Sequence, residues 1–224
     1  MKQIVVFGTQ KMAEMAWFYF EGDSPFEIVA FTVDGQHLDR KELWGKPVVP
    51  FEEVAQLYPP DRFGMFVAIG YTKMNKPRAA KFQEAKAKGY TLASYVSSKI
   101  MTLTPVKAGE NCFILENQVI QPNVRFGNDV VAWSGNHFGH DVSVDDHTWI
   151  ASHVVLSGNV SVGKSCFIGI NAAIRDGLTI ADETLIGAGA VILRSTKEKE
   201  VYIGKQTERY PLDSEQLMRM TDIS

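Results

Sequence analysis

The chain has 224 residues, a formal net charge of −3 and a hydrophobic content of 45%. This length allows one large or two modest domains with buried cores, and the slightly acidic balance lacks the basic surface that nucleic-acid binding requires. No apolar run reaches 18 residues, and the opening MKQIVVFG meets charge and glycine too early for a signal peptide, so we expect a cytoplasmic protein without a membrane segment.

The first hundred residues alternate between short apolar runs and helical patterns. Strands are predicted at residues 4–7, 27–32, 65–69 and 92–96, and helices at residues 10–20, 51–57 and 75–86. In the last of these helices, Asn75 is expected to cap the N-terminus and Pro77 to lie in the first turn. This alternation indicates an α/β domain of Rossmann type, with a small parallel sheet, over residues 1–100.

Three segments of this domain are predicted to leave the carboxyl edge of the sheet, where α/β proteins bind ligands. The candidate substrate-binding residues in these segments are Gly8, Thr9, Gln10, Lys11, Asp34, Gly70, Tyr71, Lys73 and Asn75. The first segment opens a helix, whose N-terminus favours anions, but it keeps only the first glycine of a GxGxxG motif. An ordinary βα turn at Gly8 and a solvated loop after Gly70 therefore stay open as alternatives.

From Ile114 to Ile192, an apolar residue stands at every sixth position, and a small or β-branched residue follows four positions after most of them. This period fits neither an α-helix nor a simple amphipathic strand. It is typical of a left-handed parallel β-helix, in which three short strands and three corners make one turn. We assign this β-helix to residues 101–206 and a C-terminal tail to residues 207–224.

The two cysteines, Cys112 and Cys166, both occupy the small inward position of the six-residue register. They are 54 residues apart, which is three turns of 18 residues, so they are expected to lie on one stack. At roughly 4.8 Å per turn their separation is about 14 Å, too far for a disulfide. They indicate small core residues of a reduced, cytosolic protein.

Four of the five histidines lie between positions 137 and 153. Phe138 holds an inward position, so His137 and His140 point outward, and His140 stands at a corner beside Asp141. A neighbouring carboxylate can hold an imidazole in one tautomer and make it more basic, as a general base requires. His140 and Asp141 are therefore the predicted catalytic residues, and His137 is a candidate to line the same site.

The other two histidines of this group, His147 and His153, are predicted to be ordinary polar surface residues. The spacing does not bring three histidines onto one face, and no cysteine joins them, so we expect no metal site.

The hexapeptides, the Rossmann-like front domain, His140-Asp141 and the stretch Gly187-Ala188-Gly189-Ala190 together resemble a family of bacterial sugar acyltransferases. Its members are of the sialic-acid O-acetyltransferase (NeuD) and bacillosamine N-acetyltransferase (PglD) type, and the resemblance covers residues 3–206. It implies that the front domain holds the nucleotide of a UDP- or TDP-linked amino sugar. It also implies that the β-helix forms trimers with acetyl-CoA between adjacent subunits.

Carried over by position, the resemblance implies that His140 is the base, that Asp141 orients it and that the N–H of Gly158 faces the acetyl carbonyl. It places contacts to CoA at Ile170, Asn171, Gly187, Ala188, Gly189, Ala190 and Lys205. Many relatives carry another histidine where this chain has Trp149. Trp149, Asn136 and His137 are expected to line the active site.

The sequence thus predicts an acetyl-CoA-dependent N-acetyltransferase for a nucleotide-linked amino sugar of bacterial surface-glycan biosynthesis. Direct transfer is expected because no cysteine or serine is suitably placed beside His140. A homotrimer with active sites between subunits is the expected assembly. Two alternatives stay open: a sugar O-acetyltransferase of the same fold, and a β-helical binding or scaffold protein without catalysis.

Overall fold

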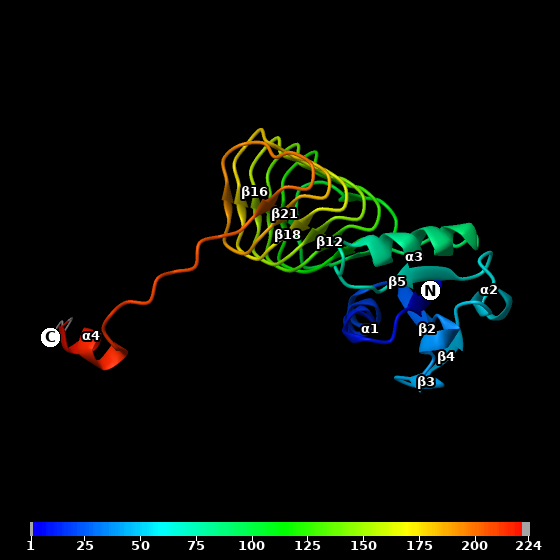
Figure 1. The fold of residues 1–224 in the computed structure, drawn as a ribbon. Helices are drawn as coiled ribbons and strands as arrows, with labels where there is room; N and C mark the ends of the chain where they lie inside the picture. The colour runs from blue at the N-terminus through cyan, green and yellow to red at the C-terminus, as the bar shows by residue number, and fades with distance from the viewer. Residues whose placement is uncertain (1, 221–224) are drawn as a thin grey trace.

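The structure is a computed structural model that describes residues 2–220. A front domain (blue to teal in Figure 1) lies beside a β-helix (green to orange), and an extended segment leads away from the end of the β-helix. These two units confirm the predicted α/β domain followed by a left-handed parallel β-helix. No helix among the described residues is both long and apolar enough to cross a bilayer.

The front domain is built on a five-stranded sheet with the order β3-β4-β2-β1-β5. Its strands are β1 (Lys2–Phe7), β2 (Phe26–Val33), β3 (Glu42–Leu43), β4 (Lys46–Pro50) and β5 (Gly64–Val67). Its helices are α1 (Lys11–Asp23), the 3-10 turn η1 (Gly35–His37), α2 (Val54–Leu57) and α3 (Lys76–Ala87). All neighbouring strands are parallel except β3, which pairs antiparallel with β4 at the edge.

The two faces of the front sheet are covered differently. Val5 and Phe7 of β1 pack in one cluster with residues of α2 and α3. Ile4 and Val6 pack in another cluster with Phe20 of α1 and with residues of the β-helix. Because β1 is buried on both faces, its sequence is a continuous apolar run rather than an alternating one.

The predicted strand at residues 92–96 is wrong as a single strand of the front sheet. Leu92 makes an isolated parallel bridge to Met65, and the chain then leaves the sheet. Tyr95 and Val96 form β6 (Tyr95–Val96), which pairs with Phe113–Ile114 of the β-helix. The Tyr95 ring packs against Phe20 and Phe113, so this apolar run joins the two units instead of completing the first.

The β-helix has three parallel sheets, here called faces 1, 2 and 3 in the order in which the chain visits them. Face 1 contains β6, β9 (Phe113–Ile114), β12 (Val131–Ala132), β15 (Trp149–Ile150), β18 (Phe167–Ile168), β21 (Leu185–Ile186) and β23 (Val201–Tyr202). Face 2 contains β7 (Met101–Thr102), β10 (Val119–Ile120), β13 (His137–Phe138), β16 (Val155–Leu156), β19 (Ala173–Ile174) and β22 (Val191–Ile192). Face 3 contains β8 (Lys107–Ala108), β11 (Arg125–Phe126), β14 (Ser143–Val144), β17 (Ser161–Val162) and β20 (Thr179–Ile180).

The six-residue register is confirmed throughout the β-helix. Every residue of the predicted inward series from Ile114 to Ile192 is at most 4% exposed. Strands of one face pair with an offset of 18 residues, as His137 with Val119 and Val155. At the corners, short polar residues such as Asn123, Asp141 and Asn159 adopt positive φ, a conformation that asparagine and aspartate tolerate better than most residues.

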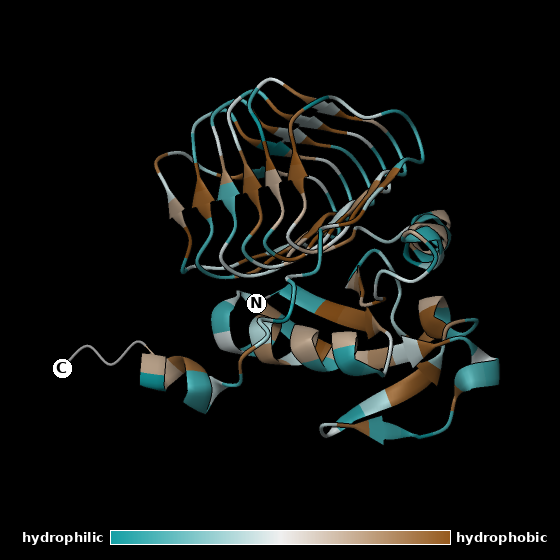
Figure 2. Cartoon of the chain, turned by 60° about the vertical axis from the view of Figure 1, so that its left-hand side comes forward, coloured by the Kyte–Doolittle hydropathy of each residue, from teal (hydrophilic) through white to brown (hydrophobic). Residues whose placement is uncertain are grey.

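Face 1 packs against the front domain, and polar clamps lie at both of its corners. At the corner between faces 3 and 1, the buried Arg78 places its Nε 3.0 Å from both carboxylate oxygens of Asp129. At the corner between faces 1 and 2, Tyr19 Oη donates to Glu116 over 2.8 Å. Figure 2 shows apolar residues along the strands where the β-helix meets the front domain.

A third clamp holds the end of α1 to the start of the β-helix. Asp23 Oδ2 accepts hydrogen bonds from Tyr95 Oη (2.6 Å), Ser97 Oγ (3.1 Å) and Ser98 N (2.9 Å). Bonds from Ser98 and Tyr95 lower the pKa of Asp23 to about 2, because they stabilise its ionised form.

The predicted tail at 207–224 contains the short helix α4 (Ser214–Met220), which Figure 1 shows lying away from the β-helix. Residues 221–224 of that tail lie outside the described residues.

Candidate functional site

The predicted catalytic pair lies at the corner between faces 2 and 3, directly after β13. His140 Nδ1 is 2.9 Å from Asp141 Oδ2, and the two side chains are 55% and 47% exposed. Asn123, one turn earlier, donates its Nδ2 to Asp141 Oδ1 over 2.9 Å. The bonds from His140 and then Asn123 hold the pKa of Asp141 below its usual range. With Nδ1 held by the carboxylate, Nε2 of His140 is the nitrogen that can accept a proton.

Gly158 lies against the imidazole from the next turn of the β-helix. A Cβ atom at this position would stand only 2.5 Å from His140 Nε2, so the ring can occupy its place only because residue 158 is glycine. Within residues 2–220 the Gly158 N–H donates no hydrogen bond. The base nitrogen and an uncommitted backbone donor therefore lie close together, on two successive turns.

The residues predicted to contact CoA lie at a different corner, between faces 1 and 2. Ile170, Asn171, Ala188 and Gly189 are exposed there, and Lys205 is exposed just beyond the end of β23. Gly187 is partly buried, and Ala190 is 5% exposed with its side chain in the core, so Ala190 can offer a ligand only its backbone. The full width of face 2 separates these residues from His140 within one chain.

Asn136 does not line a surface, contrary to expectation. It is 1% exposed and points into the β-helix. Its Nδ2 donates to the carbonyl of Trp133, and its Oδ1 accepts from the N–H of Val154. Position 136 follows the inward Ala132 by four residues, so the six-residue register itself indicates an inward side chain here. His137, the next residue, does face outward on face 2 and is partly buried.

Trp149 lies on face 1 beneath the front domain rather than at the corner of His140. It is 3% exposed, its ring centroid is 5.1 Å from that of Tyr71, and the Arg78 guanidinium lies 5.3 Å from its ring. A role beside His140 of the same chain is therefore excluded by its position.

Six of the predicted front-domain residues meet in one cleft of about 800 Å³ at the carboxyl edge of the sheet. They are Gly8, Thr9, Gln10, Lys11, Asp34 and Gly70. Gly8 has φ +123° and a Cβ there would lie 2.8 Å from the carbonyl oxygen of Ala68, so the tight turn needs glycine. Asp34 is paired with Lys81 Nζ over 2.7 Å.

The same cleft has a lining that the sequence did not suggest. Gln36, His37 and Asp39 join it from η1 and the loop after it. These residues come directly after β2, at the carboxyl edge of the sheet. The turn sequence Asp34-Gly35 is the feature of the sequence that could have indicated a loop there. We call this cleft the edge pocket.

The other predicted residues of the third loop lie outside the edge pocket. Lys73 is exposed and lines none of the clefts described here. Asn75 is fully buried: its Nδ2 donates to the carbonyl of Cys166 over 3.0 Å and its Oδ1 accepts from Arg78. It precedes α3 as predicted but makes no side-chain cap, because its amide is committed to the β-helix.

Tyr71 lines a second, smaller cleft between the front domain and face 1. This aromatic cleft has a volume of about 350 Å³. It is lined by Tyr71, Trp133, Trp149, Ala151, Ser152, Phe167, Gly169, Ile170 and Ala188.

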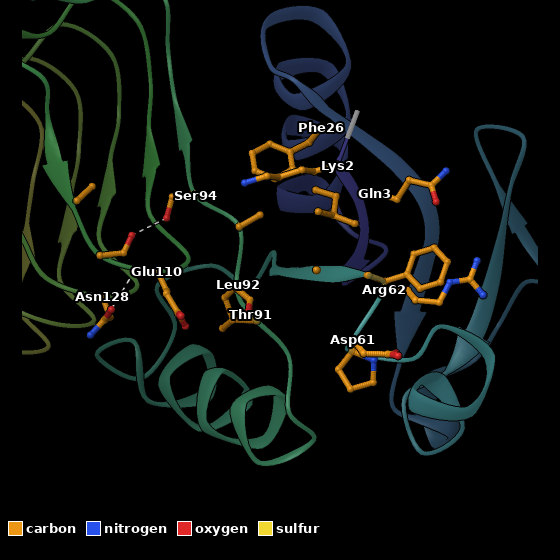
Figure 3. Close-up of a pocket in the computed structure, with 17 residues that line it drawn as sticks. Lys2, Gln3, Phe26, Asp61, Arg62, Thr91, Leu92, Ser94, Glu110 and Asn128 are labelled. Carbon is orange, nitrogen blue, oxygen red and sulfur yellow. Dashed lines mark hydrogen bonds between the residues drawn. The ribbon is translucent and has the colours of Figure 1, made fainter.

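A further cleft of about 780 Å³ opens between the two units at the opposite edge of the front sheet (Figure 3). Lys2, Arg62 and Leu92 line it from the front domain, and Glu110 and Asn128 from the β-helix. The residues predicted from the sequence to carry chemistry are not among its lining residues.

His147 is not the plain surface residue that was expected. Its Nδ1 is 2.9 Å from Asp129 Oδ2, its carbonyl accepts from Arg78 Nη2, and its ring packs on Phe82 of α3. His153 is exposed at the corner between faces 1 and 2. Among residues 2–220 no three His, Cys, Asp or Glu side chains are grouped so that they could hold a metal ion.

Comparisons with known proteins agree with this architecture. Residues 159–194 match the bacterial transferase hexapeptide (six repeats) family. A UDP-3-O-acylglucosamine N-acyltransferase from Herminiimonas arsenicoxydans is 33% identical over 111 residues, which are 48% of this chain and 29% of that protein. The match thus spans less than a third of that relative's length.

Solved structures share the fold over most of the chain. A perosamine N-acetyltransferase from Caulobacter crescentus, solved with CoA and GDP-perosamine, has a TM-score of 0.79 at 22% identity, covering 91% of this chain and 94% of that one. The acetyltransferase domain of PglB from Neisseria gonorrhoeae FA1090 has a TM-score of 0.78 at 22% identity, covering 91% and 97%. With its transferase hexapeptides and this two-unit fold, the chain is similar to the hexapeptide-repeat sugar acyltransferases, in agreement with the resemblance that its sequence carries.

Proposed function

We propose that the protein is an acetyl-CoA-dependent N-acetyltransferase acting on a nucleotide-linked amino sugar in bacterial surface-glycan biosynthesis. The observation that carries this proposal is the exposed His140–Asp141 pair lying against Gly158. A proton acceptor beside an uncommitted backbone N–H is what acyl transfer to an amine requires.

In the proposed reaction His140 Nε2 takes the proton of the substrate amine while the amine nitrogen attacks the thioester carbonyl. The C–N bond forms, the C–S bond breaks, and CoA leaves as its thiol with the proton that His140 held. Asp141 stabilises the imidazolium between these two proton transfers. The Gly158 N–H would stabilise the charge on the carbonyl oxygen, a contribution of about 3 kcal/mol in comparable enzymes.

Direct transfer is supported by the positions of the two thiols. Cys112 and Cys166 are buried at the corner between faces 3 and 1, away from the corner of His140. Burial raises the pKa of both thiols to about 12, so neither is available as a nucleophilic thiolate.

The edge pocket is the proposed site of the nucleotide. Its turn from Gly8 to Lys11 leads into α1, a helix of 13 residues whose first N–H groups favour a phosphate. Lys11 adds a positive charge, and Asp34 and His37 offer polar atoms to a ribose or a base.

A homotrimer with active sites between subunits is part of the proposal, and face 2 supports it. The outward residues of this face include Met101 (70% exposed), Val155 (41%) and Val191 (64%). Face 1 is covered by the front domain from β9 to β18, and face 3 presents polar residues such as Arg125 and Ser161. An apolar face of this kind is commonly covered by another chain, and symmetric closure about an axis is the usual solution.

If face 2 of each copy turns toward a common axis, the corner of His140 in one subunit approaches the corner of Ile170 and Ala188 in the next. The base and the proposed CoA residues, which lie on opposite edges of face 2 in one chain, would then share one groove.

Light scattering is expected to give about three times the 24.9 kDa chain mass. Val155→Glu should dissociate the assembly and Ser161→Glu, on face 3, should not; a wild-type monomer would contradict the trimer.

The activity itself is tested by thiol release from acetyl-CoA with a panel of UDP-, GDP- and TDP-linked amino sugars and their hydroxyl counterparts. Release with amino sugars and an N-acetyl product by mass spectrometry supports the proposal. Release with hydroxyl acceptors alone would indicate the sugar O-acetyltransferase. Absence of release with every acceptor, together with intact folding, would favour a binding or scaffold protein.

A further inference from the structure

Three consecutive residues, one turn before the His140–Asp141 pair, are all bonded to it. Gln121 Oε1 accepts the main-chain N–H of His140 over 2.8 Å, and the carbonyl of Pro122 accepts the N–H of Asp141 over 3.1 Å. Asn123 Nδ2 donates to Asp141 Oδ1 over 2.9 Å. The first two bonds fix the main chain of the pair, and the third fixes a side chain.

The bond from Asn123 differs from a side-chain bond that joins two turns elsewhere in the β-helix. At the corner between faces 3 and 1, Asp146 Oδ1 accepts the main-chain N–H of Asn128 over 2.7 Å, so this carboxylate ties one turn directly to the next. Asp141 Oδ1 accepts from a side-chain amide instead, and its Oδ2 faces His140 Nδ1. The main-chain bond from Asp141 to the preceding turn is made separately by its N–H. The contact between Asn123 and Asp141 therefore orients a carboxylate rather than joining the backbone of two turns.

Asp141 needs such a contact because its side chain is 47% exposed. Exposed side chains change rotamer within nanoseconds, and water competes for their polar atoms. With Oδ1 held by Asn123, Oδ2 stays directed at the imidazole. Arg125 also acts on Asp141, but through its charge alone, so it does not set the direction of the carboxylate.

The direction of this carboxylate decides which nitrogen of His140 can act as a base. A neutral imidazole in water carries its proton mainly on Nε2, which would place an N–H where the proton of the acceptor amine must be taken up. The hydrogen bond made by one ring nitrogen determines the protonation of the other. A carboxylate held at Nδ1 keeps the proton there and leaves the lone pair on Nε2.

We infer that Asn123 is a positioning residue: by holding Asp141, it keeps the proton of neutral His140 on Nδ1 and leaves Nε2 free as the base. Its role in catalysis rests on the proposed function, whereas the tautomer of His140 can be measured without any substrate. Asn123 acts through Asp141, with no contact of its own to the imidazole.

The test variant is Asn123→Gly, which removes the amide. Glycine adopts the φ of 67° found at Asn123 without strain, so the corner should keep its shape. Ser165→Gly is the matched control, because Ser165 has φ of 54° at the corner between faces 3 and 1. Thermal unfolding of both variants checks that they fold like the wild type.

The first measurement is the tautomer of His140, from ¹⁵N–¹H correlation spectra of the full chain labelled at histidine. Spectra are recorded above the titration range of His140, and its signal is assigned by its loss in His140→Asn. The wild type and Ser165→Gly are expected to show the Nδ1–H form, and Asn123→Gly a shift toward the Nε2–H form. The same tautomer in Asn123→Gly as in the wild type overturns the inference.

The second measurement is a double-mutant cycle on turnover in the thiol-release assay. Asn123→Gly should lower turnover roughly tenfold, the effect of one hydrogen bond to a charged group, with the KM for acetyl-CoA unchanged. In the Asp141→Asn background, Asn123→Gly should cause no further loss, because a residue that acts through Asp141 has nothing left to orient. Undiminished turnover in the single variant, or the same tenfold loss in both backgrounds, overturns the inference and leaves the proposed function intact.

The two proposals can fail separately. A wild type that releases no thiol with any acceptor contradicts the proposed function. The tautomer measurement on the unliganded chain then still decides whether Asn123 controls His140.

Discussion

Two His–Asp pairs in this protein have the same contact and different surroundings. His140 Nδ1 lies 2.9 Å from Asp141 Oδ2, and His147 Nδ1 lies 2.9 Å from Asp129 Oδ2. The first pair is about half exposed at a free corner of the β-helix, whereas the second has exposures of 15% and 0%. The contact alone therefore does not define a catalytic pair.

The partners of each pair account for the difference. Asp129 also accepts from Arg78 and Asn111, so its charge is committed to holding the front domain on the β-helix. Asp141 accepts from Asn123 and His140 alone among the described residues, and the open ring nitrogen of His140 is accessible. Docking of the front domain converts one corner into a structural clamp and leaves the other free for chemistry.

The largest effect is expected from His140→Asn. Loss of the general base should lower the turnover number by about 10²–10⁴-fold. Affinity for CoA and the unfolding midpoint should stay unchanged, because the side chain is exposed. Lys164→Asn, an exposed change at the corner between faces 3 and 1, is the control and should retain wild-type turnover in the thiol-release assay. Near-native turnover in His140→Asn would remove His140 as the base.

Arg78→Met tests the surroundings of the buried His147–Asp129 pair, and we expect it to lower stability rather than turnover. Removing the cation leaves Asp129 buried without its counter-charge, which typically costs about 3–5 kcal/mol of unfolding free energy. Urea unfolding measures this loss, and turnover per folded molecule should change far less than in His140→Asn. Arg40→Met, which breaks the exposed pair with Asp39, should leave the midpoint unchanged. An unaltered midpoint in Arg78→Met would contradict the role of the clamp.

Asp141→Asn sharpens the comparison at the catalytic corner. Asparagine tolerates the positive φ of 61° at this position, so the fold should persist. Loss of a charge-assisted hydrogen bond to the imidazolium should lower turnover by about 10–100-fold. Asp129→Asn is the matched change at the other pair and should lower stability while turnover per folded molecule is kept. If Asp129→Asn lowered turnover per folded molecule and Asp141→Asn lowered only stability, the roles assigned to the two His–Asp pairs would be reversed.

The smallest effect concerns pH and the third clamp. The pKa of Asp23 is lowered to about 2 from a model-compound value of 3.8, so its ionised form stabilises the folded state. That stabilisation is fully present above pH 4 and is lost as the pH falls toward 2. Asp23→Asn should therefore unfold at lower urea concentration than wild type at pH 6, with the difference shrinking below pH 4. If the difference in urea midpoint between wild type and Asp23→Asn stayed the same from pH 6 to below pH 4, the lowered pKa of Asp23 would be contradicted.

The repeat made the β-helix predictable to the level of single side chains. Phe138 inward implies His140 outward at a corner, and the structure agrees. The prediction for Asn136 was wrong even though the same register places it inside, because it rested on the position of Asn136 beside His137 and ahead of His140. The buried amide is satisfied by two main-chain groups, which a register does not reveal.

The front domain could be predicted only to the level of its elements. The edge pocket was predictable because the carboxyl ends of parallel strands meet in space. The burial of Arg78 and Asn75 was not, since each is bonded to a residue more than 50 positions away across the domain boundary. No local periodicity encodes such a contact.

Because the turns of the β-helix repeat every 18 residues, the height of a functional group along the solenoid is a matter of sequence position alone. Asn159 occupies the place of Asp141 one turn later and already has φ 59°. Gly158→His and Asn159→Asp, with His140→Gly to remove the original ring and Asp176→Gly to admit the new one, would raise the pair by one turn, roughly 4.8 Å. The corner between faces 2 and 3 thus offers equivalent backbone positions at a regular spacing of roughly 4.8 Å. The catalytic pair can be moved from one of these positions to the next, and so relative to the edge pocket, without a change in the backbone.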